Sequence, residues 1–291
     1  MGYSFATFHW LHPFTPPGSR VLDLGSQDIS IGCEAELVEV NKFIAHGGGI
    51  AQRIARYPAT YTAAEIWTRA GYDYRCIDVD ERPDTIRVDL QGCEYPTELK
   101  YAFDLVMNAG TTEHLANPAG GLAFAHYACR NGGVIAHDVP LFGLKNHGLV
   151  NPTPKFWSIL RWLNNYEVLS AAARQCEELP GDPNHYSEAL SFIAGVEAAV
   201  HLSWMISIAF RKRGSAAFVA PIDAVLPKSD GTLEAQLISS AMLPLIAGGV
   251  WSEAEADDAV RQATRAIKGR SIPIRIAAKV ASAIAGRLRA R

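Results

Sequence analysis

The stretch VLDLGSQDISIG, residues 21–32, sets the first expectation for the fold. Val21 to Leu24 form an apolar run of the length of a buried strand, and Gly25 follows at once, where the backbone can turn sharply without a clash at Cβ. A dinucleotide-binding fingerprint would continue with two further glycines, but Ser26, Gln27 and Asp28 come next. The stretch therefore indicates a ligand site at the end of a strand and leaves the ligand open.

The composition is that of a folded protein without a general basic field. Of the 291 residues, 48% are hydrophobic and 20% are charged, and the formal net charge is -3, so we expect no nucleic-acid partner. The five cysteines lie far apart, without a CxxC pair, which indicates a reducing compartment and no metal site. Because the sequence shows neither a signal-peptide pattern nor an apolar run of roughly 18 residues, we expect a cytoplasmic protein.

Strand-like and helix-like segments alternate through the first half of the sequence. Thr62 and Glu65 form a capping-box pattern, and Thr153 followed by Pro154 is a good helix start. The predicted helices cover 62–71, 118–133 and 153–165, and the predicted strands cover 21–24, 74–80, 82–89, 103–108 and 134–140. This alternation predicts an α/β fold with a doubly wound, mostly parallel sheet. Residues 201–226 read as two strands around a basic turn, which predicts an antiparallel edge strand.

The patterns divide the chain into three regions. Residues 1–19 end in the turn cluster TPPGS and form an N-terminal leader, whose aromatic side chains we expect to pack on the core. The main domain covers 20–230, and a helical extension covers 231–291. The last stretch, 271–291, carries five cations and no acid beside an apolar stripe. We expect it to dock on its own domain or on a partner subunit, as in a homodimer, with a weak membrane-surface contact as the alternative.

Polar residues follow nearly every predicted strand, and in parallel α/β sheets ligands bind outside the carboxyl ends of the strands. These residues are Asp23 to Asp28, Asp78 to Asp80, Asp89, Asn108 to His114, and His137 to Pro140. A carboxylate at Asp78 suits the two hydroxyls of a ribose, and Asp89 suits the amino group of an adenine. Asp23 and Asp28 would repel a pyrophosphate but favour an ammonium and a sulfonium centre. We therefore infer S-adenosylmethionine rather than NAD as the ligand.

The segments RVLDLGSQD, YRCIDVD, RVDL, FDLVMNAGTTEHL and NGGVIAHDVP resemble, in this order, the class I S-adenosylmethionine-dependent methyltransferases of the small-molecule type. The segment at 146–157, NHGLVNPTPKFW, resembles a continuation in an uncharacterised branch of that family. The resemblance implies a Rossmann-like sheet of seven strands and S-adenosylmethionine as the cofactor. It implies that Asp23, Gly25, Ser26 and Gln27 hold the methionine part, Asp78 the ribose, Asp89 and Leu90 the adenine, and that Asn108, Ala109 and Gly110 supply backbone contacts.

Two features depart from the pattern of that family. Ser26 and Gln27 stand where the family has the end of its GxG motif, so the contact with the methionine part must differ in detail. The distance from Gly25 to Asp78 also exceeds that of a single helix, which predicts an insertion at 33–61. We expect this insertion to form a lid.

Four residues are candidates for a catalytic role, namely Glu113, His114, His137 and His147. A hydroxyl acceptor must lose its proton as the methyl group moves, and imidazole titrates near neutral pH, so we expect one of the three histidines to serve as general base. Each of them also has a purely structural alternative. An in-line methyl transfer could also proceed without a general base, through the positioning of donor and acceptor.

The sequence thus predicts a methyltransferase that moves a methyl group from S-adenosylmethionine to an oxygen of a small-molecule or glycan-like acceptor. Two alternatives stay open. The replacement of the glycine motif by Ser26 and Gln27 allows a non-catalytic subunit that keeps the fold. An NAD-dependent oxidoreductase is the other alternative, and the missing glycines disfavour it.

Overall fold

The computed structural model describes residues 5–49, 52–83, 85–92, 94–142, 147–176 and 203–222, together with four isolated positions, 233, 236, 237 and 254. Apart from those four, the predicted helical extension at 231–291 lies outside the described residues. The expectations for its basic last stretch, including the homodimer and the membrane contact, lie outside them as well.

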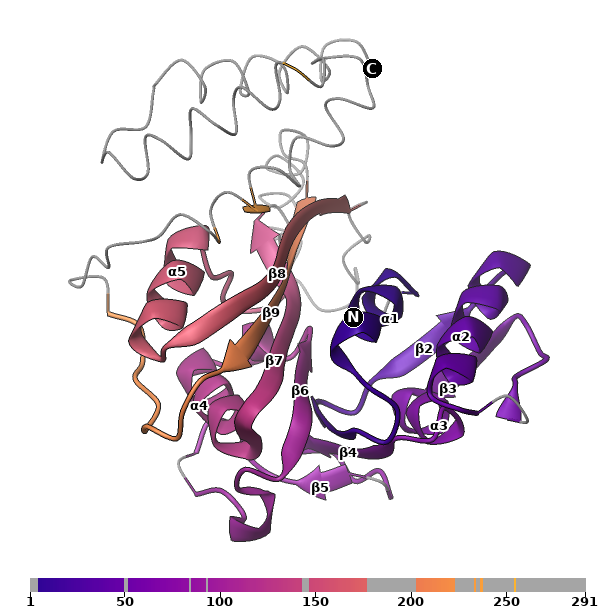
Figure 1. Ribbon diagram of the computed structural model, residues 1–291, viewed down its shortest axis with the longest axis horizontal. Helices are drawn as coiled ribbons and strands as arrows, with labels where there is room; N and C mark the ends of the chain where they lie inside the picture. Colours follow the sequence, from indigo (N-terminus) through magenta and orange to yellow (C-terminus); the bar gives the residue numbers. More distant parts are fainter. Residues whose placement is uncertain are drawn as a thin grey trace, which may run out of the picture.

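Seven strands form one sheet in the order β5-β4-β1-β6-β7-β9-β8 (Figure 1). They are β1 (Arg20–Leu24), β4 (Asp73–Asp78), β5 (Thr85–Arg87), β6 (Phe103–Ala109), β7 (Cys129–Phe142), β8 (Tyr166–Cys176) and β9 (Ser203–Lys212). Strand β1 pairs in parallel with β4 and β6, whereas β9 runs antiparallel to both β7 and β8. The predicted α/β fold with a doubly wound, mostly parallel sheet of seven strands is confirmed. The antiparallel strand β9 lies one place in from the edge, which β8 occupies.

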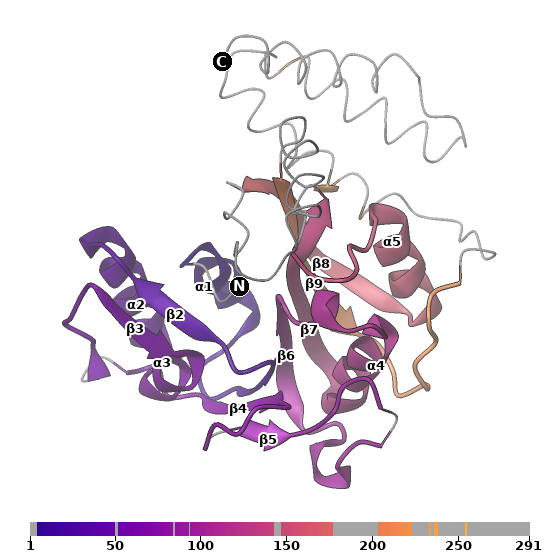
Figure 2. The same ribbon diagram turned by 180° about the vertical axis from the view of Figure 1, so that it is seen from behind.

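Helices cover both faces of this sheet (Figures 1 and 2). On one face lie α4 (Pro118–Ala128) and α5 (Pro154–Leu163), and on the other α1 (Phe5–Leu11), α2 (Glu34–His46) and α3 (Ala63–Arg69). Alternate side chains of β1 enter two separate cores, because successive residues of a strand point to opposite faces. Leu22 and Leu24 pack in the core of α4 and α5, and Val21 packs in the core of the other three helices.

The helix starts follow the capping residues of the sequence. At α3, Glu65 N donates to Thr62 Oγ1 at 3.1 Å, and Thr62 N donates to Glu65 Oε2 at 2.8 Å, which confirms the predicted capping box. At α5, the Phe156 N–H donates to Thr153 Oγ1. Helix α4 ends earlier than predicted, since β7 begins at Cys129 and takes in residues 131–133. Pairing with β6 at Phe103 places this segment in the sheet.

An additional unit separates β1 from α3. It consists of β2 (Asp28–Ile31), α2 and β3 (Ala59–Thr62), and β2 pairs antiparallel with β3 in a sheet of its own. Helix α1 of the leader packs against α2, with the rings of Phe8 and Phe43 4.6 Å apart. Trp10 packs near Phe14 and donates its indole N–H to Ser170 Oγ on β8. The leader is thus packed against both the additional unit and the main sheet.

In the described part of 201–226, residues 203–222, the predicted hairpin is not formed. Strand β9 supplies one arm, but residues 213–222 form no strand. The partner of β9 is β8, with pairs running from Tyr166 opposite Lys212 to Cys176 opposite Ser203. Strand β8 was not predicted, because its sequence YEVLSAAARQC is rich in good helix formers. Pairing with β9 overrides that local preference.

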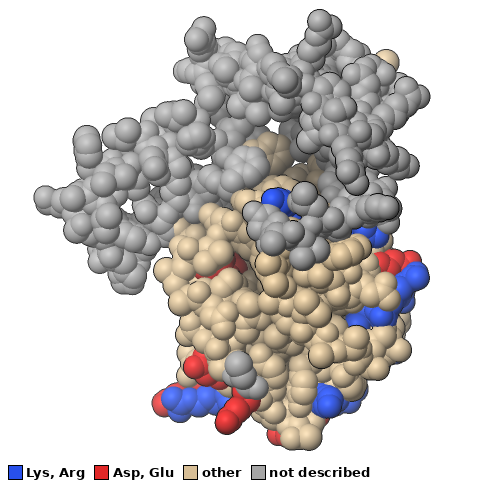
Figure 3. Space-filling model, turned by 90° about the vertical axis from the view of Figure 1, so that its left-hand side faces the viewer, with Lys and Arg blue, Asp and Glu red and all other residues tan. Residues whose placement is uncertain are grey.

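The face seen in Figure 3 carries its charged side chains in small separate groups, some of one sign and some of both, and uncharged residues cover most of the rest of the described surface. In the part of the chain that the structure describes, no helix is long and apolar enough to cross a membrane.

Three short 3-10 turns complete the described elements, η1 (His12–Phe14), η3 (Thr97–Leu99) and η4 (Thr112–His114).

Candidate functional site

The chain leaves β1 toward β4 and β5 on one side and returns to β6 on the other, so the strand order reverses between β1 and β6. Open α/β sheets bind ligands at such a point, outside the carboxyl ends of the strands. A cavity of about 450 Å³ opens there. Six of the ten residues predicted to bind the cofactor line it, namely Gly25, Gln27, Asp78, Asp89, Leu90 and Gly110. The other lining residues are Ile77, Val79, Val88, Gln91, Thr111, His114 and Leu115.

Gly25 forms the turn after β1 and cannot carry a side chain there. Its φ is +98°, and a Cβ would lie 2.5 Å from Thr111 Oγ1 and 2.7 Å from Gln27 Nε2. Its N–H donates to Ile77 O at 2.7 Å, which fixes the turn to β4. Glycine at this position lets the segments after β1 and β6 approach each other at the cavity.

Ser26 binds the end of β4 instead of facing the cavity. Its N–H donates to Asp78 Oδ2 at 2.9 Å, and its hydroxyl contacts both Asp78 Oδ2 and Asp80 Oδ2. The other oxygen of Asp78, Oδ1, accepts from Val79 N at 2.7 Å. A serine hydroxyl has one proton, so it donates to only one of the two acids at a time. A carboxylate accepts about four hydrogen bonds, so about two remain for a ligand at Asp78.

Asp28, which follows Gln27, forms an ion pair with Arg82. Asp28 accepts two hydrogen bonds from the Arg82 guanidinium, at 2.8 and 2.9 Å. Burial raises the pKa of Asp80, but hydrogen bonds from Ser26 and Thr85 and the charge of Arg82 outweigh it and hold that pKa below its ordinary value. Asp28 is absent from the cavity lining. The sequence argument that Asp28 selects against a pyrophosphate is therefore not supported.

Four of the residues expected to contact the cofactor lie outside the cavity lining, namely Asp23, Ser26, Asn108 and Ala109. Asp23 is fully buried in β1, and its Oδ2 accepts from the hydroxyl of Tyr74 at 3.1 Å. Asn108 and Ala109 are buried at the end of β6. Their side chains lie outside the described lining, and their contacts with a cofactor stay a prediction.

His137 belongs to a buried network that supports the segment after β6. Asn108 Nδ2 donates to Thr112 Oγ1 at 2.8 Å and to His137 Nδ1 at 3.1 Å, and Thr112 N donates back to Asn108 Oδ1 at 3.1 Å. An amide nitrogen only donates, so Nδ1 of His137 accepts and the neutral ring carries its proton on Nε2. Burial lowers the pKa of His137 to about 3. It packs against Trp157 and does not line the cavity.

The other three predicted catalytic residues come together beside the cavity. Glu113 and His114 belong to η4, and His147 follows β7 in the sequence. His147 Nε2 lies 3.8 Å from Glu113 Oε1, and the rings of His114 and His147 are 4.8 Å apart. Burial lowers the pKa of His114 and the neighbouring His147 lowers it further, while the Glu113 carboxylate acts in the opposite direction. Through His114, this group borders the cavity.

The loop that carries His147 is held against Glu113 by its backbone. Leu149 N and Val150 N both donate to Glu113 O, at 2.6 and 3.1 Å. Gly148 has a φ of +75°, and a Cβ on it would lie 2.9 Å from both Cγ and O of Glu113. The NHG sequence at 146–148 thus permits a close approach that a larger residue would prevent.

Two polar residues line the cavity that were not predicted to bind the cofactor, namely Thr111, which lies within the candidate range Asn108 to His114, and Gln91, which does not. The Thr111 hydroxyl donates to Leu24 O and receives Gln27 Nε2 at 3.3 Å, so it joins the segments after β1 and β6. Gln91 Oε1 accepts from Ala116 N. The position of Thr111 just after a strand was the available signal, since all residues at that edge are candidates.

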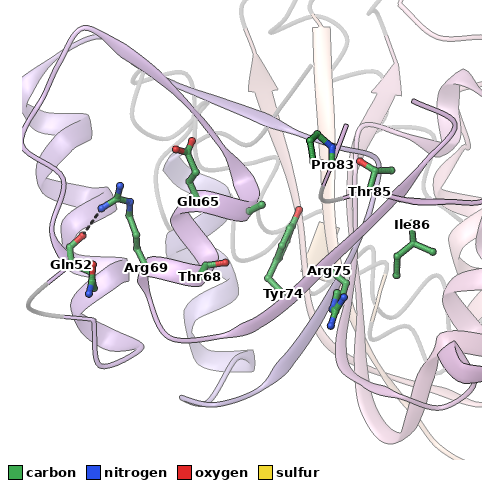
Figure 4. Close-up of a pocket in the computed structure, with 10 residues that line it drawn as sticks. Gln52, Glu65, Thr68, Arg69, Tyr74, Arg75, Pro83, Thr85 and Ile86 are labelled. Atoms are coloured by element: carbon green, nitrogen blue, oxygen red, sulfur yellow. Dashed lines mark hydrogen bonds between the residues drawn. The ribbon is translucent and has the colours of Figure 1, made fainter. Parts of the chain in front are cut away.

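Two further hollows lie on the other side of β4. The larger, about 590 Å³, lies between α3 and the strands β4 and β5 (Figure 4). Glu65 and Arg69 of α3 stand on one side of it and Thr85 and Ile86 of β5 on the other, with Tyr74 between them. None of the predicted site residues lines it. The smaller, about 190 Å³, includes Ser26 and Gln27. Of the predicted lid at 33–61, none of the residues that the structure describes lines the 450 Å³ cavity.

Comparisons with known proteins give distant structural likenesses. No protein-family model matches the sequence, and no curated protein matches it. The cyclase SpnF is 13% identical at a TM-score of 0.41, over 72% of this chain and 81% of that one. The YcgJ protein of Bacillus subtilis is 7% identical at 0.44, over 73% and 100%. An S-adenosylmethionine-dependent methyltransferase of Archaeoglobus fulgidus is 15% identical at 0.41, over 72% and 92%. At these scores, the function is to be argued from the residues of this chain.

Proposed function

We propose that the protein is an S-adenosylmethionine-dependent methyltransferase that methylates an oxygen of a small-molecule or glycan-like acceptor. The observation that carries this proposal is the single cavity at the β1/β6 crossover, which joins Gly25, Asp78 and Asp89 from three separate strand ends. It borders the group formed by Glu113, His114 and His147. A donor site and a reactive group thus lie side by side.

The cavity offers oxygens where an adenosine needs them. In this proposal, Asp78 accepts from the ribose hydroxyls with the two lone pairs that Ser26 and Val79 leave open. Asp89 Oδ1 accepts from Gln91 N at 2.9 Å, and its other oxygen accepts no hydrogen bond from the described residues. That oxygen suits the adenine amino group. Leu90 and Val88 supply apolar contact for the base.

The site lacks the features that a pyrophosphate needs. After Gly25 the chain enters β2 rather than a helix, so no helix N-terminus points at the cavity from β1. The charged side chains in its lining are Asp78 and Asp89, with His114 as the one titratable base. Among the described residues of the lining there are two carboxylates and no arginine or lysine, which favours a cationic ligand over a dinucleotide.

The reaction that we propose is an in-line displacement at the sulfonium methyl group. A lone pair of the acceptor oxygen forms the new C–O bond, the C–S bond breaks, and its electron pair stays on sulfur. The proton of the acceptor hydroxyl must leave in the same step or before it. The group of Glu113, His114 and His147 would receive the acceptor hydroxyl and assist that loss. His137 is excluded from this role because it is buried away from the cavity.

Titration calorimetry with S-adenosylhomocysteine, the demethylated product, tests the donor site. Asp78→Asn should weaken binding by about 10- to 150-fold, since hydrogen bonds to a charged group contribute about 1.5–3 kcal/mol. The matched control is Asp73→Asn at the opposite end of the same strand, where Asp73 is exposed and pairs with Arg20 at 3.2 Å. The control should keep the wild-type affinity.

Three outcomes separate the candidate functions. A wild-type chain that binds neither S-adenosylmethionine nor its product contradicts the proposal. Equal weakening by Asp73→Asn and Asp78→Asn would show that the effect comes from the fold and that the ribose is misplaced. Binding of NADH in preference to either ligand would support the oxidoreductase instead.

A further inference from the structure

Glu113, His114 and His147 have the composition of a metal site. Each offers one ligand atom, and these three atoms all lie within 4.8 Å of one another. Glu113 and His114 are neighbours in η4, and His147 comes from a loop that follows β7 in the sequence. Residues 33 positions apart therefore meet at one point beside the cavity.

The carboxylate of Glu113 has no hydrogen-bond partner among the described residues. Its side chain is 0% exposed, and neither carboxylate oxygen accepts a hydrogen bond. His147 Nε2 is also buried without a hydrogen-bond partner. A buried ionised carboxylate without compensation costs several kcal/mol, so such groups are normally paired or bound to a metal. The two unsatisfied groups face each other across 3.8 Å.

We propose that Glu113, His114 and His147 bind a divalent first-row transition metal ion such as Zn²⁺. Two imidazoles and one carboxylate are a ligand set of catalytic zinc and iron sites, whereas Mg²⁺ prefers oxygen ligands alone. Two ligand atoms at about 2.0–2.2 Å from an ion with tetrahedral angles are about 3.4 Å apart. The separation of 3.8 Å between His147 and Glu113 is close to this value. For the three ligand atoms to bind one ion, separations of up to 4.8 Å must shorten to about 3.4 Å.

The backbone around these residues is fixed before any ion binds. Leu149 N and Val150 N hold the His147 loop on Glu113 O, and Gly148 allows its close contact with the Glu113 side chain. On the other side, Thr112 N donates to Asn108 Oδ1 and holds η4 on the end of β6. The ligand residues therefore stand on an ordered frame, as a metal site requires.

Three protein ligands leave a coordination position open, and His114 places the site at the wall of the 450 Å³ cavity. A water molecule or the oxygen of an acceptor could occupy that position, and a bound cation would lower the pKa of the oxygen. Binding of the ion stands independently of the proposed function. Its part in methyl transfer rests on that function.

Metal titration of the full chain, with any affinity tag removed and bound metals stripped, tests the site directly. The wild-type protein should bind one Zn²⁺ per chain, and Co²⁺ in its place should give the visible absorption of a four-coordinate ion. Glu113→Gln and His147→Ala should each weaken Zn²⁺ binding. Loss of a residue that only hydrogen-bonds to a metal ligand costs about 10- to 100-fold in affinity, so loss of a ligand should cost at least as much. The matched control, His9→Ala, removes an exposed histidine of α1 and should leave binding unchanged.

His147→Ala keeps the test valid if the buried change at Glu113 disturbs folding, because His147 lies in a loop with a side chain that is 22% exposed. Absence of Zn²⁺ binding, binding that survives both substitutions, or tighter binding of Mg²⁺ than of Zn²⁺ would overturn the proposal. Titration with S-adenosylhomocysteine in the presence of EDTA measures the affinity of the donor site in the absence of bound metal. If the chain binds S-adenosylhomocysteine but not Zn²⁺, the metal proposal fails. If it binds Zn²⁺ but not S-adenosylhomocysteine, the proposed function fails.

Discussion

His137 provides a test of the buried network because its neutral state is built into the fold. Its Nδ1 accepts from Asn108 Nδ2, and burial lowers its pKa from the ordinary 6.5 to about 3. Protonation of Nδ1 would remove that hydrogen bond and place a charge beside Trp157. The change that we consider is His137→Asn, which keeps an acceptor oxygen near Nδ1 and removes the titrating group.

The expected magnitude follows from proton linkage. Below pH 6.5 the unfolded chain binds a proton at His137 and the folded chain does not, so the free energy of unfolding falls as the pH falls toward about 3. The loss is RT ln(1 + 10^(6.5 − pH)), which is about 2 kcal/mol at pH 5 and about 0.1 kcal/mol at pH 7.5. Stability from this group is therefore fully present above pH 6.5.

Urea unfolding at pH 7.5 and pH 5 measures the difference in wild type and variant. His137→Asn should reduce the loss between the two pH values by about 2 kcal/mol, whatever it does to the stability at pH 7.5. Burial also lowers the pKa values of His12, His114 and His126, so the wild-type loss exceeds the share of His137. The control His9→Asn at an exposed position should change the loss far less than His137→Asn does, since His9 is only the last of three causes that lower the pKa of His12. An undiminished loss in His137→Asn would refute the assignment of a neutral buried imidazole.

Two further substitutions test the contacts around the cavity and helix α4. Ser26→Ala should leave S-adenosylhomocysteine affinity within about threefold, since Ser26 binds Asp78 and is absent from the lining, and should lower the free energy of unfolding by about 1 kcal/mol. A tenfold loss of affinity in calorimetry would show a direct contact with the donor. Lys212→Met should cost about 2–3 kcal/mol in urea unfolding, because the buried ammonium donates to His126 O and Cys129 O at the end of α4.

The sheet was predictable because its strands carry their own signals. Apolar runs that end in glycine or in acids placed β1, β4 and β6, and the pair Thr62 and Glu65 placed the start of α3. Strand β8 was not predictable in this way, since Leu169, Ala171 and Ala173 suit a helix as well as a strand. Its state is decided by β9, which follows some thirty residues later. Long-range pairing of this kind leaves no local trace.

The candidate site could be predicted in outline and not in detail. The rule that ligands bind at strand ends located Gly25, Asp78 and Asp89 together at one cavity. It could not show that Ser26 turns toward Asp78 and Asp80, because these contacts span 52 and 54 residues. The titration range of imidazole, which made histidines candidates for the general base, could not distinguish His137 from His147.

The two histidines are separated by what surrounds them. One lies in the sheet among Asn108 and Trp157, where burial keeps it neutral. The other lies in a loop that Glu113 O and Gly148 hold against η4. Both histidines were candidates for the general base by residue type, and the packing of neighbouring segments gives them different surroundings.

The walls of the cavity come from residues between Gly25 and Leu115 that meet only when β1 lies between β4 and β6. The unfolded chain therefore lacks the nucleoside site. A ligand that binds in this cavity binds only the folded state and shifts the folding equilibrium toward it by mass action. At a concentration one hundred times its dissociation constant, such a ligand adds about 2.7 kcal/mol to the free energy of unfolding. Under the proposed function, the concentration of the donor would then influence the fraction of the protein that is folded and resistant to proteolysis, as well as the rate of the reaction.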